Sequence, residues 1–405
     1  MSKLKILAIR WASLSVTTAG LSLISAMAVA DQAATEDDSQ NFAVPGGDSS
    51  TGNEIIGLES ANTALNPFQR LVGGWPDDLV LAPVPAYSAQ LGWNLTLGGA
   101  YFLDIGEDDP SSPPSIIGGF AMGAENGSYA YGGGMHLHLA GDKIRIKAGA
   151  AYADIRYQFY GIGNSIDALD FDIGILQNGP AYFASASWNI WSKLYVGLGY
   201  RSASVDTRLR LNLPSPPAFD PVVSVDLAAI SIPIEIDSRD HNQFPRDGWY
   251  IAGRTVLYRK SAGSDIEAET YKLSANRYIP MREKDVLATR LVVRSASEEV
   301  PFFLLSTFGG KTDLRGYPAG RYRDRSMFAL QAEYRWQMSD RWIFTGFAGV
   351  GEVANSFSEM GENLLPAVGI GARFLLSEKH KVGLSVDIAA GNDGTEFYFG
   401  VGESF

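Results

Sequence analysis

The chain has 405 residues, no cysteine and a formal net charge of -12 at pH 7. The lack of cysteine excludes disulfides, thiolate metal sites and thiol nucleophiles, and the acidic balance argues against a nucleic-acid partner. The 44 Gly, 18 Tyr and 20 Phe are typical of a sheet with crowded interior positions and aromatic girdles. A soluble β-sandwich would share this composition, so it favours an all-β protein without deciding its environment.

The first 30 residues have the layout of a secretory signal peptide. A basic start precedes an uncharged stretch from Trp11 to Ala30 that ends on small residues. An uncleaved anchor helix is the alternative, because such a stretch could just span a bilayer, but the acidic residues that follow at once favour cleavage after Ala30. Residues 31–86 are rich in Gly, Ser, Asn and acid, and we expect them to form a flexible periplasmic arm.

From residue 88 onward, apolar and polar residues alternate with a period of two. In the run 381–389, one face carries the apolar residues Val382, Leu384, Val386 and Ile388. This pattern is typical of a strand with one face toward lipid and the other toward a polar lumen. It predicts an all-β fold, a transmembrane antiparallel β-barrel over residues 87–405.

The alternating runs predict sixteen strands, an even number as a single-chain bacterial barrel requires. They are expected at residues 88–103, 115–124, 128–139, 143–157, 180–190, 193–205, 222–237, 248–258, 266–278, 285–294, 301–308, 326–337, 341–352, 364–376, 380–390 and 395–405. Residues 159–179 are long for a turn, so fourteen and eighteen strands remain alternatives. In residues 223–237 the apolar residues move from odd to even positions near Ala228-Ala229, and a β-bulge is the economical explanation.

Two stretches in the second half resemble the bacterial surface antigen superfamily, the outer-membrane barrels that include BamA, TamA and the transporters of two-partner secretion. Asp237-Ser238-Arg239-Asp240 is similar to the family's aspartate-x-arginine-aspartate strand end. Leu314-Arg315-Gly316-Tyr317 is similar to its loop of an aliphatic residue, Arg, Gly and an aromatic. The resemblance implies that this loop, between strands 11 and 12, folds into the lumen and is followed by five strands.

An arginine folded into a lumen loses water and needs a carboxylate for its donors. In the family that partner is an Asp in a phenylalanine-x-aspartate-x-glycine run on the second strand after the loop, where this chain has Gly349. The alternation in residues 328–336 directs Glu333 toward the lumen, so we predict a contact between Arg315 and Glu333. The plainer alternatives are an exposed arginine in a surface loop and a solvated lumen carboxylate.

The final strand ends in an aromatic residue, as the machinery that assembles outer-membrane barrels expects. Its alternation predicts a C-terminal assembly signal on one outward face, formed by Phe397, Phe399, Val401 and Phe405. Glu403 interrupts this apolar row two residues before the end. The sequence therefore supports a barrel strand here more strongly than it supports a standard insertion signal.

Few residues suit catalysis. His136 and His138 share one strand face, where two neutral histidines are far more common than a metal site or a base. The sequence has no Gly-x-Ser-x-Gly elbow. An enzyme such as a lipase is therefore the least favoured class, and we expect neither a cofactor nor a metal.

The pattern and the resemblance together imply a non-enzymatic protein of the bacterial outer membrane that acts in protein or lipid export or assembly. A passive small-solute pore, with the Arg315 loop as a constriction, is the alternative. Expected partners are outer-membrane lipids and lipopolysaccharide, the barrel-assembly machinery during insertion, and a secreted client or a periplasmic partner. The stretch 31–86 is too short for the family's usual periplasmic domains, so we expect none of them.

Overall fold

The fold is built from one large antiparallel sheet. The computed structural model describes residues 79–88, 90–103, 105, 115–163, 173–211, 222–241, 244–311, 313–377, 382–401 and 403–405. The expected signal peptide and most of the expected arm lie outside these residues. Within them, the large sheet contains sixteen strands and a second sheet contains two. In this part of the chain, no helix has the length and apolar character needed to cross a membrane.

The strands of the large sheet follow one another in chain order, each paired antiparallel with its neighbours. Their bounds are β1 (Leu79–Ser88), β2 (Gly92–Leu103), β3 (Ser115–Ala124), β4 (Tyr129–Leu139), β5 (Ile144–Phe159), β6 (Ile173–Trp191), β7 (Leu194–Leu211), β8 (Val222–Asp237), β9 (Gly248–Tyr258), β10 (Ala268–Pro280), β11 (Val286–Ala296), β14 (Ser326–Gln337), β15 (Trp342–Ala354), β16 (Leu365–Ser377), β17 (Val382–Gly391) and β18 (Gly394–Val401). The second sheet pairs β12 (Ser306–Phe308) with β13 (Tyr322–Asp324). Three short 3-10 helices are η1 (Lys260–Ala262), η2 (Phe302–Leu304) and η3 (Phe357–Glu359).

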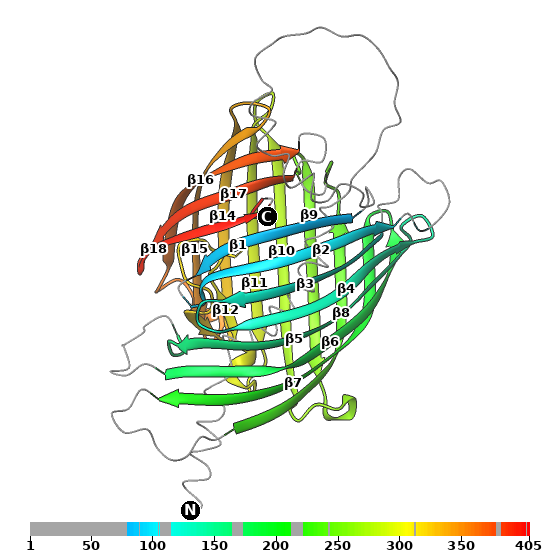
Figure 1. Ribbon diagram of the computed structural model, residues 1–405, viewed down its shortest axis with the longest axis vertical. Helices are drawn as coiled ribbons and strands as arrows, with labels where there is room; N and C mark the ends of the chain where they lie inside the picture. Colours follow the sequence, from blue (N-terminus) through cyan, green and yellow to red (C-terminus); the bar gives the residue numbers. More distant parts are fainter. Residues whose placement is uncertain are drawn as a thin grey trace, which may run out of the picture.

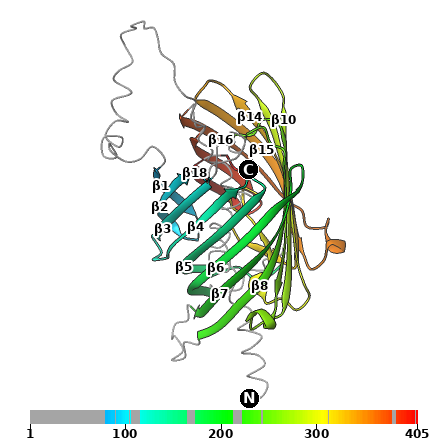
Figure 2. The ribbon, with the colours of Figure 1, turned by 90° about the vertical axis from the view of Figure 1, so that its right-hand side faces the viewer.

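The large sheet curves round on itself. Figures 1 and 2 show β1 beside β18, the first and last strands of the hydrogen-bonded order, and the two strands are in contact. Across this junction, the ring of Trp93 on β2 lies 6.2 Å from the ring of Phe399 on β18. Exposed tryptophans stand on the outer face, among them Trp188, Trp249, Trp336 and Trp342. The prediction of an all-β antiparallel fold is confirmed.

Two of the strand assignments predicted from the sequence are wrong. β1 begins at Leu79, so the sheet starts inside the stretch expected to be an arm and before the boundary at 87. Pro83 and Pro85 conceal this strand in the sequence, because proline cannot donate a hydrogen bond to a neighbouring strand and so weakens a strand prediction. The run 301–308, expected as a strand of the wall, instead holds η2 and β12 in the connection between β11 and β14. The two errors cancel in the strand count.

The strands β5 to β8 are long, with 16 to 19 residues each. β6 begins at Ile173, so the connection expected at 159–179 is shorter than predicted. Along β8, exposed residues stay at even positions from Val222 to Ile236, and the register with β7 and β9 does not shift. The predicted bulge at Ala228-Ala229 is therefore wrong.

What changes along β8 is the chemistry of its two faces. Before Ala229, the inner face is apolar, with Leu227 buried, and the outer face carries Asp226. After Ala229, the outer face carries Ile230 and the inner face buries Glu235. A strand shows this inversion where its outer face passes from lipid into water, because polar side chains then favour the outside. In the sequence, this exchange of polar and apolar residues between the two faces looks like the change from odd to even positions that a β-bulge causes.

Candidate functional site in the sheet interior

The predicted lid loop, Leu314-Arg315-Gly316-Tyr317, lies in the connection between β11 and β14, and all four residues are buried. Gly316 has a φ of 111°, and a Cβ there would lie 3.1 Å from the Cβ of Ala367 on β16. Glycine takes this conformation and this close approach without strain. The Arg-Gly pair therefore lets the loop backbone lie directly against the inner face of β16.

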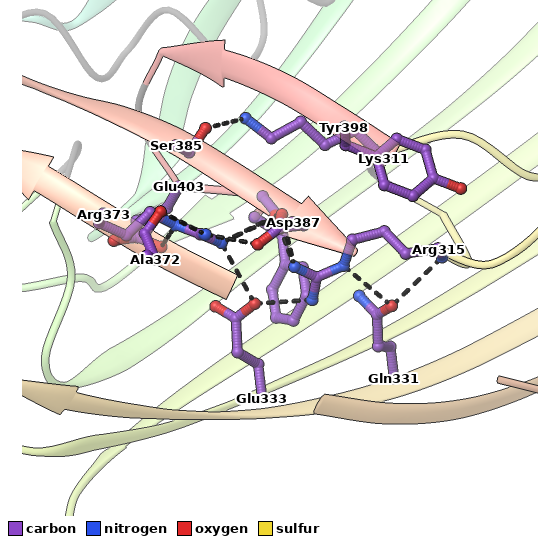
Figure 3. A network of polar contacts seen from close by, with 12 residues as sticks. Lys311, Arg315, Gln331, Glu333, Ala372, Arg373, Ser385, Asp387, Tyr398 and Glu403 are labelled. Carbon is purple, nitrogen blue, oxygen red and sulfur yellow. Dashed lines mark hydrogen bonds and ion pairs between the residues drawn. The ribbon is translucent and has the colours of Figure 1, made fainter. Parts of the chain in front are cut away.

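Arg315 is fully buried and bound by two carboxylates (Figure 3). Its Nη2 lies 2.6 Å from Oε2 of Glu333 on β14, the partner expected from the sequence, and its Nη1 lies 3.0 Å from Oδ2 of Asp387 on β17. The backbone N and the Nε of Arg315 both donate to Oε1 of Gln331 at 3.3 Å. The guanidinium also lies 3.4 Å from the ring centre of Phe347. Arg315 thus finds inside the sheet the charge and acceptors that it loses with water.

Two further arginines bind the same carboxylates. Arg373 on β16 donates to both oxygens of Asp387, and Nε of Arg335 on β14 lies 2.8 Å from Oε1 of Glu333. A third carboxylate, Glu403, accepts from Nε of Arg373 at 3.1 Å. Three guanidinium groups thus face three carboxylates, each side chain at most 7% exposed. We call this set the charged network: Arg315, Arg335, Arg373, Glu333, Asp387 and Glu403.

Tyr317 and its neighbours fix the other side of the loop. The Tyr317 hydroxyl donates to the backbone oxygen of Pro366 at 2.6 Å and accepts from the backbone N of Asn392 at 3.2 Å. Gly316 N donates to the hydroxyl of Tyr398 at 2.9 Å, and that hydroxyl donates to the backbone oxygen of Tyr317 at 3.3 Å. The loop is therefore tied to β16, to β18 and to the turn between β17 and β18.

Leu314 occupies the space that the family's aspartate would fill. A Cβ on Gly349 would lie 2.6 Å from Cδ1 of Leu314 and 2.7 Å from the backbone oxygen of Leu330. Glycine at 349 therefore makes room for the loop, and the carboxylates come from β14 and β17 instead. Gly371 makes room in the same way, because a Cβ there would lie 1.8 Å from Oδ1 of Asp387.

Two more charged loop side chains border the network. Nζ of Lys311 donates to Oγ of Ser385 at 2.8 Å (Figure 3), and burial together with the Arg373 guanidinium lowers the pKa of Lys311 to about 8. Burial alone would raise the pKa of Asp313, but Nη2 of Arg294, 2.6 Å from its carboxylate, holds that pKa below its usual range. The loop thus carries one cation that is easily neutralised and one carboxylate that stays charged.

The start of the same connection packs on apolar side chains. Phe303 and Leu304 of η2 are buried in one cluster with apolar side chains of β4 to β10. We call this set the apolar cluster, and its wall includes Ile155, Tyr157, Phe159, Ile175, Val205 and Leu227. Each buried Phe or Leu side chain contributes about 1.5–3 kcal/mol. One connection is therefore held by two anchors of different chemistry.

The predicted strand-end motif organises the connection from β8 to β9. Nη2 of Arg239 lies 2.7 Å from Oδ2 of Asp237, and its guanidinium lies 4.2 Å from the ring centre of Tyr250 on β9. Oδ1 of Asp240 accepts from the backbone N of Asp247 at 3.1 Å. These contacts fix the turn and set Tyr250 in place on the inner face of the sheet.

The predicted assembly signal on β18 is only partly on the outer face. Phe397 and Phe399 are exposed there, by 48% and 37%. The strand ends at Val401, whose side chain lies outside the described part. Phe405, expected on the same face, instead packs in the interior against Tyr278 and its neighbours. The prediction for Phe405 is wrong because the alternation of the strand does not continue to residue 405.

Of the two histidines on β4, His138 belongs to a structural ion-pair cluster and His136 lies against its ring. The rings of His136 and His138 lie 4.2 Å apart, and Nδ1 of His138 lies 2.6 Å from Oδ1 of Asp142. Asp142 also accepts from Arg145, which in turn binds Glu235. The described residues contain no group of three or more acidic or histidine side chains that could hold a metal ion.

Sequence reasoning missed part of the charged network. Alternation in residues 381–389 sets Asp387 on the face opposite Val386 and Ile388, and that signal could have named it as a second partner of Arg315. Nothing in the sequence indicated the role of Ser404, whose Oγ accepts from Nη1 of Arg315 at 2.9 Å. Its position depends on the path of the chain beyond β18.

A comparison of the sequence with protein families assigns the chain. Residues 184–405, more than half of the chain, match the Omp85 superfamily domain. The chain belongs to the Omp85 superfamily. The predicted resemblance to BamA/TamA-type outer-membrane proteins is thereby confirmed, and so is the predicted location in the outer membrane. No curated protein sequence matches this Omp85 chain.

Solved structures share the fold of this Omp85 protein. BamA from Haemophilus ducreyi lacking POTRA domains 1-3 matches with a TM-score of 0.55 and 15% identity, over 87% of this chain and 80% of that one. CdiB from Acinetobacter baumannii gives 0.54 and 11%, over 81% and 60%. CdiB from Escherichia coli gives 0.56 and 10%, over 82% and 63%. At these identities the likeness shows a common fold, and the chain spans less than two thirds of either CdiB chain.

Proposed function

We propose that this Omp85 protein is a closed outer-membrane barrel, gated by the Arg315 loop, that acts without enzymatic chemistry in protein or lipid export or assembly. The observation that supports it best is the fully buried Arg315, bound inside the sheet to Glu333 and Asp387. Burying these charged side chains costs free energy. The ion pairs of the docked loop offset that cost, which favours a specific role for the docked position.

In this proposal the Arg315 loop is a lid with two discrete states. When it is docked, charge-assisted hydrogen bonds replace the water around Arg315. When it leaves, Glu333 and Asp387 remain in the interior without their loop partner, which costs about 3–5 kcal/mol for a broken buried pair. Because these bonds form or break together, the lid switches between states rather than opening by degrees.

We further propose that the junction of β1 and β18 is the lateral path. The hydrogen-bonded order of the described strands begins at β1 and ends at β18, and these two lie side by side (Figure 1). Strands at the ends of a sheet offer unpaired backbone groups and separate more easily than strands in its middle. Opening this seam would give a client or a lipid a route from the lumen into the bilayer.

We expect three kinds of partner for such a barrel. Outer-membrane lipids and lipopolysaccharide would surround the outer face with its exposed tryptophans. The barrel-assembly machinery would act on the chain during insertion, after removal of a signal peptide over residues 1–30. A secreted client or a periplasmic partner would meet the lumen. None of these contacts needs a cofactor.

Conductance in a planar bilayer separates the gated barrel from a passive pore. Wild type should show low conductance, whereas Arg315→Ala should show a large and steady channel. The control is Arg325→Ala, a second arginine of the same connection that lies 3.7 Å from an exposed Glu298 and outside the charged network. A wild type that is already steadily open, and that Arg315→Ala leaves unchanged, would reject the lid and favour the passive pore.

The non-enzymatic part of the proposal has its own test. The purified barrel is incubated with a labelled phospholipid, and the products are separated by chromatography. We expect no turnover above that of empty vesicles. Turnover that disappears on replacing a single Ser or His would show that the protein is a lipid hydrolase.

A further inference from the structure

The chain leaves the sheet before residue 405. β18 ends at Val401, which pairs with Leu384 of β17, although β17 continues to Val382. If the strand continued in this register, residue 403 would pair with Val382 and residue 405 would lie just beyond. Instead, the end of the chain lies in the interior of the sheet in both views (Figures 1 and 2).

The position of Glu403 explains this departure. Strand alternation would set residues 397, 399, 401, 403 and 405 on the outer face, where Phe397 and Phe399 do lie. Glu403 would then face lipid, which is costly for a charged side chain. In the interior its carboxylate lies 3.1 Å from Nε of Arg373 and 3.5 Å from Nε of Arg335. The charge that interrupts the apolar row therefore directs the chain inward.

Ser404 joins the segment to the loop arginine. Its Oγ accepts from Nη1 of Arg315 at 2.9 Å and donates to Oδ2 of Asp387 at 3.3 Å. Glu403 is also the third side-chain carboxylate of the charged network, so without it three guanidinium groups would face only two side-chain carboxylates. A buried guanidinium without its counter-charge is strongly destabilising. The docked loop thus depends on residues 403 and 404.

Phe405 holds the other end of the segment. Its backbone oxygen accepts from Nη2 of Arg335 at 2.6 Å, and its side chain packs on a cluster that contains Tyr250 and Tyr278. Tyr250 is the residue on which Arg239 of the strand-end motif lies, 4.2 Å from the ring centre. Residues 403–405 thus connect the Arg315 loop with the strand-end motif.

We propose that Glu403–Phe405 is an internal latch, a positioning segment that holds the Arg315 loop docked and forgoes pairing with β17 to do so. The latch has a second available state, in which residues 403–405 extend β18 along Val382. Glu403 sets the balance between the two states. The expected effect of the latch on conductance rests on the proposed lid function. The position of residues 403–405 in the interior does not depend on that function.

The first test locates the latch. Phe405 is replaced by para-fluorophenylalanine through site-specific incorporation, and its 19F signal is recorded in detergent micelles or nanodiscs with a lipid-soluble nitroxide. In the wild type the signal should be protected, because residue 405 packs on Tyr278. In Glu403→Val, which restores an apolar outer row, broadening by the nitroxide should rise at least about tenfold. Equal broadening in both proteins would overturn the latch.

The second test asks whether the latch holds the loop. Glu403→Gln removes one charge and keeps the final aromatic residue Phe405 in the sequence, so insertion of the barrel into the membrane should not be affected. The closed-to-open ratio in a planar bilayer should fall at least about tenfold, equal to about 1.4 kcal/mol, and Ser404→Ala should act in the same direction. The control is Glu396→Gln on the same strand, outside the charged network, which should behave as wild type.

The outcomes separate the two proposals. If Arg315→Ala opens the channel but Glu403→Gln and Ser404→Ala behave as wild type, the latch is wrong and the lid stands. A second outcome is that residue 405 becomes exposed to lipid in Glu403→Val, while neither Arg315→Ala nor Glu403→Gln changes conductance. The position of the latch is then correct, but the latch does not hold a lid closed, and the proposed function is wrong. If Glu396→Gln opens the channel as strongly as Glu403→Gln, the effect is a general one of charge in the interior, and the latch is refuted.

Discussion

The charged network and the apolar cluster hold the same connection between β11 and β14 in opposite ways. Arg315 depends on directional ion pairs with Glu333 and Asp387, whereas Phe303 and Leu304 depend on contact with a broad apolar wall. Apolar burial is non-directional and tolerates small shifts, but a buried ion pair fails when its geometry is lost. In the proposed lid, we therefore infer that the apolar end is a hinge anchor and the charged end is the release point.

The largest expected effect is at the release point. Arg315→Ala leaves two buried carboxylates without their loop partner, and it should weaken loop docking by about 3–5 kcal/mol. Hydrogen exchange of residues 314–317 measures this loss as faster amide exchange. Arg315→Lys should rescue little, because an ammonium cannot reproduce the fork of the guanidinium. Full rescue by lysine would mean that only the charge matters.

A smaller effect is expected at the anchor. Leu304→Ala should cost about 2–3 kcal/mol, within the range for a buried leucine, and should raise amide exchange in residues 302–305 while leaving residues 314–317 protected. The matched control is Leu364→Ala, because that leucine is 47% exposed. If exchange rises equally at both ends of the connection, the two anchors are a single unit and the comparison does not hold.

A change at Gly349 tests why the network departs from the family pattern. Gly349→Ala should weaken docking by about 1–2 kcal/mol, because its Cβ overlaps Leu314 of the loop and the backbone of Leu330. Gly346→Ala on the same strand meets open space and serves as the control. Gly349→Asp should be worse than Gly349→Ala, although it restores the residue usual in the family. Tighter docking in Gly349→Asp would contradict the packing argument.

The smallest effect near neutral pH comes from Lys311. The docked loop lowers the pKa of Lys311 from 10.5 to about 8, so between these pH values the released loop binds more protons than the docked one. Docking is therefore strengthened as pH rises across this window, by at most about tenfold per pH unit for one proton. Channel closure measured from pH 7 to 10 should follow this trend in wild type, and Lys311→Met should remove it.

Alternation in the sequence was sufficient to predict the antiparallel sheet and the inner position of Glu333. The contact between Glu333 and Arg315 also required the family resemblance, which implied that the Arg315 loop folds inward. Alternation failed where another force overrides the period of two. In β8 the outer face changes from polar to apolar along the chain, so Asp226 and Ile230 share one face. Beyond Val401 the chain leaves its strand so that Glu403 reaches Arg373. Such long-range ion pairs have no signature in a local pattern.

In the proposed lid, the charged end of the connection, and not its apolar end, releases the loop. The direct measurement is the distance between spin labels at Ala319→Cys in the connection and Met338→Cys in the turn after β14, introduced into a chain without cysteine. Wild type and Leu304→Ala should each give one narrow distance distribution, and Arg315→Ala should give a broad one. A narrow distribution in Arg315→Ala, or an equally broad one in Leu304→Ala, would contradict the account.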